Sequence, residues 1–230
     1  MARPTLSSYL RDHLDDFGKK REPGPFVTIS RQYGCDGYDV GDMLVAKLNA
    51  RADDPEKRWR VYQKEMLRQL AEDTGLSEEI LQREQMARPS LFKDFLRGIR
   101  KGNIPDGFEI RNKIAQMIRA MAFEGHAVII GQGGASATAD IDNGLSIRLE
   151  ASKEWRIARV ASREQLTRQA AIARIDQVEK QRRQLRKIYE QRNPREPEFN
   201  LLIDNSVFSA EQVVDLIVYA MELRGLIPKA

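Results

Sequence analysis

A short apolar run that ends in a polar loop with two glycines constrains the fold more than any other stretch of this chain. Residues 26–30 (Phe-Val-Thr-Ile-Ser) have the length and β-branched content of a buried strand, and apolar residues recur at helical spacing from Val40 onward. In a strand, glycine loop and helix of this order, the helix N-terminus presents free N–H groups and a positive dipole end. The junction therefore predicts one βα unit of a parallel sheet, with a candidate anion site in its loop.

The loop matches only part of the standard phosphate-binding template, G-x-x-x-x-G-K-[ST]. Placed on residues 32–39, the template shares Gly37 and differs at its other defined positions, which hold Gln32, Tyr38 and Asp39. An ordinary turn is the alternative, in which Gly34 and Gly37 supply positive φ angles and Asp36 or Asp39 caps the helix. The loop alone leaves both interpretations open.

Composition indicates a globular protein in the cytoplasm. The chain has 230 residues, of which 41% are hydrophobic and 31% charged. This length suits one α/β domain with a subdomain, or at most two small domains, and is ample for a substantial core. No apolar run approaches the roughly 18–20 residues of a membrane span, and the first residues lack the apolar core of a signal peptide. The single cysteine, Cys35, excludes an internal disulfide and a cysteine-cluster metal site. We interpret it as a small residue that fills a tight turn.

Positive charge is concentrated between Lys153 and Arg195, where basic residues outnumber acidic ones. Such an excess fits a polyphosphate or a nucleic-acid backbone. The same segment also places opposite charges four residues apart, the spacing of ion pairs on a solvated helix. These pairs are Asp176 with Lys180, Glu179 with Arg183, and Arg186 with Glu190. Without another reason to expect a phosphate, the solvated helix is the favoured interpretation.

Strand-like and helix-like segments alternate along the rest of the chain. Further strands are predicted at residues 59–62, 127–131, 145–149 and 200–204, and a second small-residue loop at residues 132–137. Helices are predicted within residues 1–25, at 64–74, 77–87 and 110–125, twice within 153–192, and from a capping box at Ser209 to Met221. Residues 89–107, rich in Pro and Gly, predict a small insert. This alternation of strands and helices predicts an α/β fold, a parallel sheet covered by helices on both faces.

Four segments in this order resemble the cytidylate kinase-like family of P-loop nucleoside monophosphate kinases. They are residues 28–37 (TISRQYGCDG), 128–134 (VIIGQGG), 148–159 (RLEASKEWRIAR) and 199–206 (FNLLIDNS). The likeness spans about residues 26–222, with an N-terminal helix and linker in 1–25 and a tail in 223–230. It implies a P-loop kinase type of sheet, a helical substrate-binding insert at about 59–107 and an arginine-rich helical lid at about 163–195.

The resemblance also implies a reaction and its residues. ATP, with Mg²⁺, would give its γ-phosphoryl group to a nucleoside monophosphate, CMP or dCMP above all, and phosphoryl transfer of this kind needs positioning and positive charge. The residues for ATP would be Ser30, Arg31, Gly34, Cys35, Asp36, Gly37, Tyr38 and Asp39. Those for the acceptor would be Gly131, Gln132, Gly133 and Arg174. Arg31, Arg182 and Arg186 would act on the transferring group, and Asp39 would hold the metal.

Two positions depart from the family pattern and keep other functions open. Tyr38 stands where the family usually has Arg or Lys, and Gln132 where it often has Arg, so two cations are missing near the expected phosphates. A nucleotide-binding regulatory module that has lost turnover is therefore the alternative to the enzyme. Nucleic-acid binding through residues 153–195 is the weaker interpretation, because acidic residues are interleaved there and no recognition motif is present.

Overall fold

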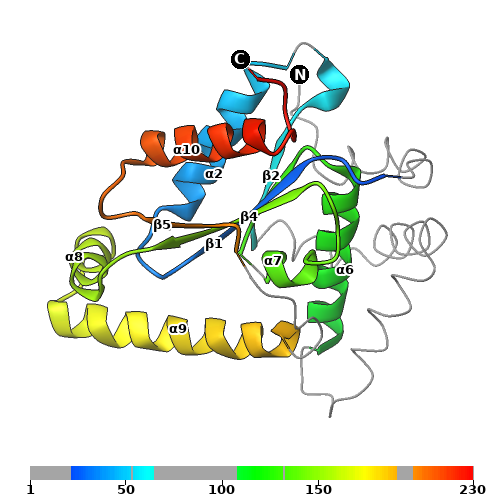
Figure 1. The fold of residues 1–230 in the computed structure, drawn as a ribbon. Helices are drawn as coiled ribbons and strands as arrows, with labels where there is room; N and C mark the ends of the chain where they lie inside the picture. The colour runs from blue at the N-terminus through cyan, green and yellow to red at the C-terminus, as the bar shows by residue number, and fades with distance from the viewer. Residues whose placement is uncertain (1–21, 53, 65–107, 132, 191–198, 230) are drawn as a thin grey trace, which may run out of the picture.

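The computed structural model describes residues 22–52, 54–64, 108–131, 133–190 and 199–229 (Figure 1). Its strands are β1 (Phe26–Arg31), β2 (Arg60–Tyr62), β3 (Ala127–Ile130), β4 (Gly144–Glu150) and β5 (Leu201–Asp204). Its helices are α2 (Gly37–Asn49), α6 (Phe108–Glu124), α7 (Gly134–Ala137), α8 (Lys153–Arg163), α9 (Arg168–Glu190) and α10 (Ala210–Leu223), with a 3₁₀ turn at Pro55–Lys57. The helices expected at residues 64–74 and 77–87, most of the segment 1–25 and most of the insert 59–107 lie outside the described residues.

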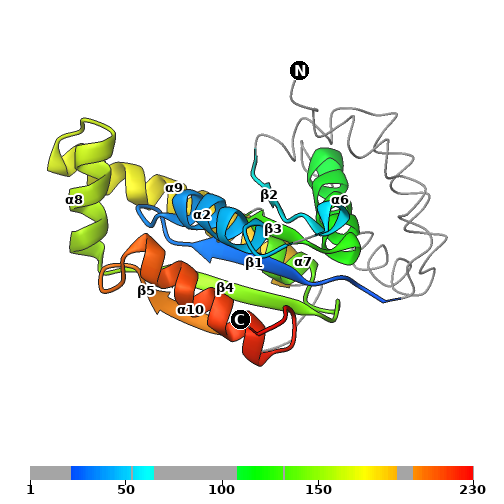
Figure 2. The ribbon, with the colours of Figure 1, turned by 90° about the horizontal axis from the view of Figure 1, so that it is seen from above.

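The strands form one parallel sheet in the order β2-β3-β1-β4-β5. Helices α2 and α10 cover one face, and α6, α7 and α9 lie on the other (Figures 1 and 2). The predicted fold class is confirmed. Because all strands run the same way, their carboxyl ends and the loops that follow β1 and β3 meet at one edge of the sheet, where ligands bind in open α/β folds.

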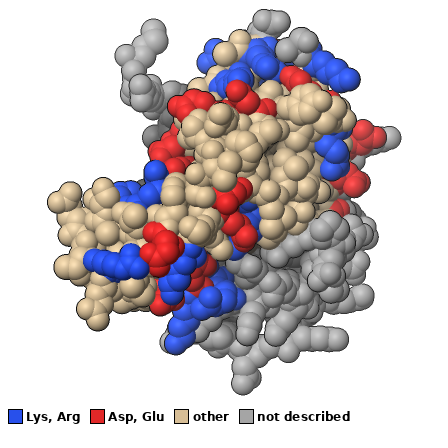
Figure 3. Space-filling model, turned by 60° about the vertical axis from the view of Figure 1, so that its left-hand side comes forward, with Lys and Arg blue, Asp and Glu red and all other residues tan. Residues whose placement is uncertain are grey.

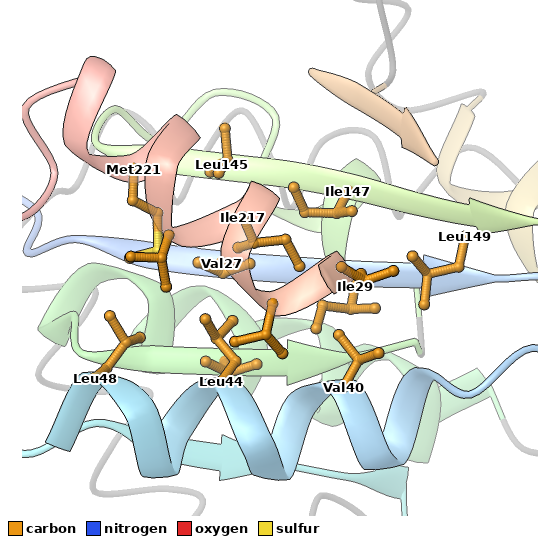
Figure 4. Packing of buried hydrophobic residues seen from close by; sticks show 14 of the residues in the cluster. Val27, Ile29, Val40, Leu44, Leu48, Leu145, Ile147, Leu149, Ile217 and Met221 are labelled. Atoms are coloured by element: carbon orange, nitrogen blue, oxygen red, sulfur yellow. The ribbon is translucent and has the colours of Figure 1, made fainter. Parts of the chain in front are cut away.

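The two faces of the central strand differ in chemistry. Val27 and Ile29 point toward α2 and α10 and are fully buried in the main hydrophobic core, with Leu44 of α2 and Ile217 of α10 (Figure 4). Thr28 and Ser30 alternate with them and therefore belong to the opposite face. Apolar burial on one face stabilises the sheet, and the polar residues of the other face are left for the site.

Three local features differ from the sequence prediction or refine it. Helix α2 begins at Gly37, three residues earlier than the apolar pattern from Val40 suggests. The second small-residue loop contains a one-turn helix, α7. The predicted capping box is confirmed, since Ser209 accepts a hydrogen bond from the Gln212 backbone and donates its own N–H to the Gln212 side chain. None of the helices in the described ranges is both long and apolar enough to cross a membrane.

Candidate functional site

A cavity of about 560 Å³ opens at the carboxyl ends of β1 and β3, next to α7 and α9. Its wall contains five basic side chains and, among the residues that the structure describes, no Asp or Glu. The basic residues are Arg31, Lys64, Arg148, Arg174 and Arg182. A concave site with this charge attracts an anion carrying several negative charges, because the positive field is concentrated by the low-dielectric wall.

Tyr33, in the loop after β1, lies among cations from α8 and α9. The guanidinium groups of Arg163, Arg174 and Arg182 lie 5.8, 5.8 and 5.4 Å from the centre of its ring. Its hydroxyl donates a hydrogen bond to Glu164, and this bond, followed by the charge of Arg174, lowers the pKa of the Glu164 carboxyl. The Tyr33 ring therefore holds three like charges together with the help of two carboxylates, Glu164 beside Arg163 and Arg174, and Glu179 beside Arg182.

Arg182 turns inward from α9 toward the loop. Its side chain is 27% exposed, and its Nη1 atom donates a 2.8 Å hydrogen bond to the Arg31 carbonyl oxygen. Burial, and then the charge of Arg31, lower the pKa of Arg182 to about 10, so the group still carries its charge at neutral pH. The solvated-helix interpretation of the basic segment is therefore wrong for this residue. Asp176 is solvated as this interpretation expects, but it forms its ion pair with Lys153 of α8 and not with Lys180.

Arg31 extends between two glycines at the mouth of the cavity. A Cβ atom on Gly131 would lie 2.0 Å from Arg31 Nη1, and one on Gly37 would lie 3.0 Å from Arg31 Cδ. The guanidinium carbon lies 4.7 Å from the centre of the Tyr38 ring, within cation–π range. A positive charge thus lies beside position 38 although residue 38 itself is neutral.

The loop between β1 and α2 is held by side chains from distant parts of the chain. Glu179 of α9 accepts the backbone N–H of Tyr33, and Asn205 accepts that of Asp36 at 2.8 Å. The Asp36 carboxylate forms an ion pair with Arg159 and gives α2 no side-chain cap. Gly34 has a φ of +103° against Arg156, whereas Gly37, buried in α2, lacks the positive φ expected of it. The loop has elements of both sequence interpretations, a turn with positive φ at Gly34 and an uncapped helix N-terminus.

The residues that the sequence predicts as site residues fall into three groups. The cavity wall brings together Ser30, Arg31, Tyr38, Gly131, Gly133, Arg174 and Arg182. The remaining described positions lie in the loop or in the first turn of α2, outside the wall, namely Gly34, Cys35, Asp36, Gly37 and Asp39. Gln132 and the side chain of Arg186 lie outside the described residues, although Arg186 belongs to α9.

Several wall residues were not anticipated from the sequence as site residues. They are Thr28, Tyr33, Lys64, Gln181, Phe199 and Arg148 among others. Arg148 is the one with a usable signal, since it is a charged residue between Ile147 and Leu149 in a strand that otherwise reads as buried. An arginine in such a strand has to be paired, and here Nε binds Glu150 at 2.8 Å and Nη1 binds Ser30 Oγ at 3.1 Å.

The donor set fits a nucleotide with its metal. The cationic wall suits phosphate oxygens, and Mg²⁺ bound to phosphates needs only one or two protein carboxylates. Asp36 is engaged by Arg159, but Asp39, exposed in the first turn of α2, forms no ion pair within the described part of the chain. Three or more Asp, Glu, His or Cys residues grouped as a metal site do not occur in the described ranges.

Charge on one face of the molecule is mixed. On the face shown in Figure 3, basic and acidic side chains of the described residues are interspersed and separated by neutral surface. Backbone binding to nucleic acids relies on a continuous basic stripe or patch. The concentrated positive charge lies in the cavity wall instead.

Cys35 should be inert to thiol reagents in the folded protein. It is buried in the main core, and this burial raises the pKa of its thiol to about 11, so that about one thiol in a thousand is ionised at pH 8. We expect modification by dithiobis(nitrobenzoate) at pH 8 to be at least about 100-fold slower than for an exposed cysteine. The same reagent should titrate one thiol at once in denaturant. Rapid modification of the folded protein would contradict the burial.

Comparisons with known proteins agree with this architecture. The model of the cytidylate kinase-like family matches residues 26–207. A crystal structure described as that of an uncharacterized protein from Eubacterium ventriosum ATCC 27560 is similar, with a TM-score of 0.65 and 20% sequence identity. The similarity covers 86% of this chain and 98% of that one, and at this identity it supports the fold alone. No curated protein matches the sequence.

Proposed function

The chain belongs to the cytidylate kinase-like family, and from that premise we propose that it transfers the γ-phosphoryl group of ATP to a nucleoside monophosphate, with CMP or dCMP as the preferred acceptor. The observation that carries the proposal is the cavity wall, with five cations and no described carboxylate at the carboxyl edge of a parallel sheet. ATP and a monophosphate together bring several negative charges into one place. Such a wall is the electrostatic complement of that pair.

Each part of the wall has a proposed role. The uncapped first turn of α2, which continues the loop of residues 31–38, binds the phosphates of ATP, because the N–H groups at a helix N-terminus and the helix dipole favour negative charge. Arg31 supplies the cation that residue 38 lacks. Arg182 stabilises the charge of the transferring group, and Arg174 contacts the acceptor. Mg²⁺, where bound with ATP, neutralises phosphate charge, and Asp39 is the carboxylate proposed to approach it.

In this proposal, helix α9 covers the bound substrates. It carries Arg174, Val178 and Arg182 on the side that lines the cavity. A helix that closes over two nucleotides excludes water, which would otherwise accept the phosphoryl group in place of the acceptor. The same helix thus supplies charge and protection from hydrolysis.

A nucleotide-binding module without turnover is the second candidate. Tyr38 in place of a cation favours it, and so does Glu179, whose carboxylate occupies the N–H of Tyr33 in the loop. Such a protein would bind ATP or ADP through the same wall and release them unchanged. The two candidates share the ligand and differ in the chemical step.

Ligand stabilisation and turnover, measured together, decide between them. The melting temperature is recorded with ATP–Mg²⁺, ADP–Mg²⁺ and each common nucleoside monophosphate, and ADP formation is followed with the same acceptors. A ligand that prefers the native state raises the melting temperature whether or not it reacts. Stabilisation by ATP and fastest ADP formation with CMP or dCMP is the expected result. Binding without turnover would establish the module, and neither binding nor turnover would refute both candidates.

A further inference from the structure

The floor of the cavity contains a buried polar atom that has no partner within the protein. Thr28, in the middle of β1, is 1% exposed, and its Oγ1 atom forms no hydrogen bond in the described structure although the residue lines the cavity. A hydroxyl buried in this way costs stability unless something satisfies it. The atom therefore marks a place where a ligand or a water molecule completes the wall.

The neighbouring strand contributes a rigid cation to the same floor. Arg148 of β4 pairs in register with Ser30 of β1, so Thr28, Ser30 and Arg148 lie on one face of adjacent strands. The Arg148 residue is 6% exposed, and its guanidinium carbon lies 5.4 Å from the centre of the Phe199 ring. Its hydrogen bonds to Glu150 and Ser30 use two of the five donors of a guanidinium group. The other donors are available on a side chain whose orientation is already fixed.

This floor is separate in origin from the cations at the cavity mouth. Arg174 and Arg182 come from α9 and lie against the Tyr33 ring, whereas Arg31 is the last residue of β1 and lies against the Tyr38 ring. Arg148 and Thr28 are mounted on the two central strands of the sheet. A group bound by Arg148 and Thr28 would thus be held by the sheet itself, the rigid part of the site.

We propose that Arg148 and Thr28 form the anchoring subsite for the acceptor, with Arg148 binding its phosphomonoester group and Thr28 Oγ1 hydrogen-bonding to a polar atom of the same molecule. This inference rests on the proposed function and adds two residues to the acceptor positions that the family resemblance implies. A phosphomonoester is the chemistry that fits, because the planar guanidinium fork binds phosphate oxygens in pairs and carries the opposite charge. The base and sugar then extend toward α7 and α9.

Two substitutions test the subsite without removing its bulk. Arg148→Lys keeps the charge and loses the fork, and Thr28→Val keeps the shape and loses the hydroxyl. Calorimetric titration is carried out with CMP, cytidine and ATP–Mg²⁺. For Arg148→Lys we expect CMP affinity to fall about tenfold or more, with cytidine and ATP within about twofold of the parent. Arg168→Lys is the matched control, since Arg168 is exposed on α9, pairs with Glu154 and lies outside the wall.

Thr28→Val gives a signature that a purely structural role would not produce. The free protein should melt at the same or a higher temperature, because an unpartnered hydroxyl has been replaced by a methyl group. Its CMP affinity should nevertheless fall about threefold to tenfold as one hydrogen bond is lost. Parent-like CMP affinity in a folded Thr28→Val protein would remove Thr28 from the subsite, and the same result for Arg148→Lys would overturn the proposal. If Arg148→Lys does not fold, the Thr28→Val titration decides alone.

Inorganic phosphate separates failure of the subsite from failure of the proposed function. If the parent binds none of the monophosphates, the nucleotide acceptor is refuted, and the subsite is then judged by the rise in melting temperature that phosphate produces. A rise in the parent and in Arg168→Lys that is lost in Arg148→Lys would support the anion subsite. No rise in the parent, or an equal rise in Arg148→Lys, would overturn it.

Discussion

Replacing Arg182 with alanine should lower kcat for phosphoryl transfer about 100-fold or more, while the KM values for ATP and CMP change only a few-fold. The guanidinium is largely buried in the cavity wall and keeps its charge there. Charge that develops on the transferring group in such a water-poor site is stabilised far more strongly than in bulk water. An interaction that strengthens in the transition state appears in kcat, and steady-state kinetics with both substrates varied will measure it.

The neighbouring residue provides the control for Arg182. Arg183→Ala removes the same charge one position further along α9, where the side chain is exposed and outside the cavity wall, and should leave both constants near those of the parent. Arg182→Lys should recover part of the lost rate, because the charge returns without the planar fork. Arg186→Ala belongs in the same series, since Arg186 is predicted from its i,i+4 spacing to share the catalytic face. A parent-like kcat in Arg182→Ala would exclude the lid from the chemical step.

Gly131→Ala should weaken ATP binding as much as removing the Arg31 side chain does, by about 1.5–3 kcal/mol. Gly131 has a φ of +72°, and its missing Cβ leaves the space that Arg31 Nη1 occupies, 2.0 Å from where the Cβ would lie. The added methyl group forces the guanidinium away from the mouth of the cavity. Calorimetric titration of ATP–Mg²⁺ into Gly131→Ala, Arg31→Ala and the double variant measures the effect.

Two comparisons distinguish displacement of Arg31 from general damage. Gly225→Ala imposes a similar positive φ of +66° where nothing lies within 4 Å of the new Cβ, so it should cost about 1–2 kcal/mol of stability and no ATP affinity. In the double variant, Gly131→Ala should have no further effect once Arg31 is gone. Additive losses in the double variant would mean that Gly131 acts independently of Arg31.

The sheet could be predicted from the sequence because its signals are local. Runs such as residues 26–30 and 127–131 are apolar and β-branched, and each is followed by a loop and a helix, which leaves a parallel α/β sheet as the natural arrangement. The first residue of α2 was harder to predict from the sequence. Asp36 is a residue type that is favoured at helix N-caps, but its carboxylate forms an ion pair with Arg159, more than a hundred residues away in the sequence. Such a partner leaves no trace in local spacing.

The candidate site was only partly predictable for the same reason. Parallel strands bring the loops after β1 and β3 to one edge, so Arg31, Tyr38 and Gly131 could be expected near one another. The i,i+4 spacing in α9 predicted an ion pair of Glu179 with Arg183, whereas Glu179 accepts the Tyr33 N–H and pairs with Arg182, which also donates to the Arg31 carbonyl oxygen. Tertiary contacts decided between two arrangements that the spacing allows equally.

The hydrogen bond from the Tyr33 amide to Glu179 has a consequence for how the loop exchanges its ligands. The Glu179 carboxylate already accepts a hydrogen bond from the Tyr33 N–H group, which a phosphate would use under the proposed function. Under the proposed function, a nucleotide phosphate that uses this N–H group would first have to displace the Glu179 carboxylate, and the apparent affinity for the nucleotide would fall accordingly. In the protein without ligand, Glu179 thus occupies the Tyr33 N–H group, and the loop exchanges one anion, the Glu179 carboxylate, for another.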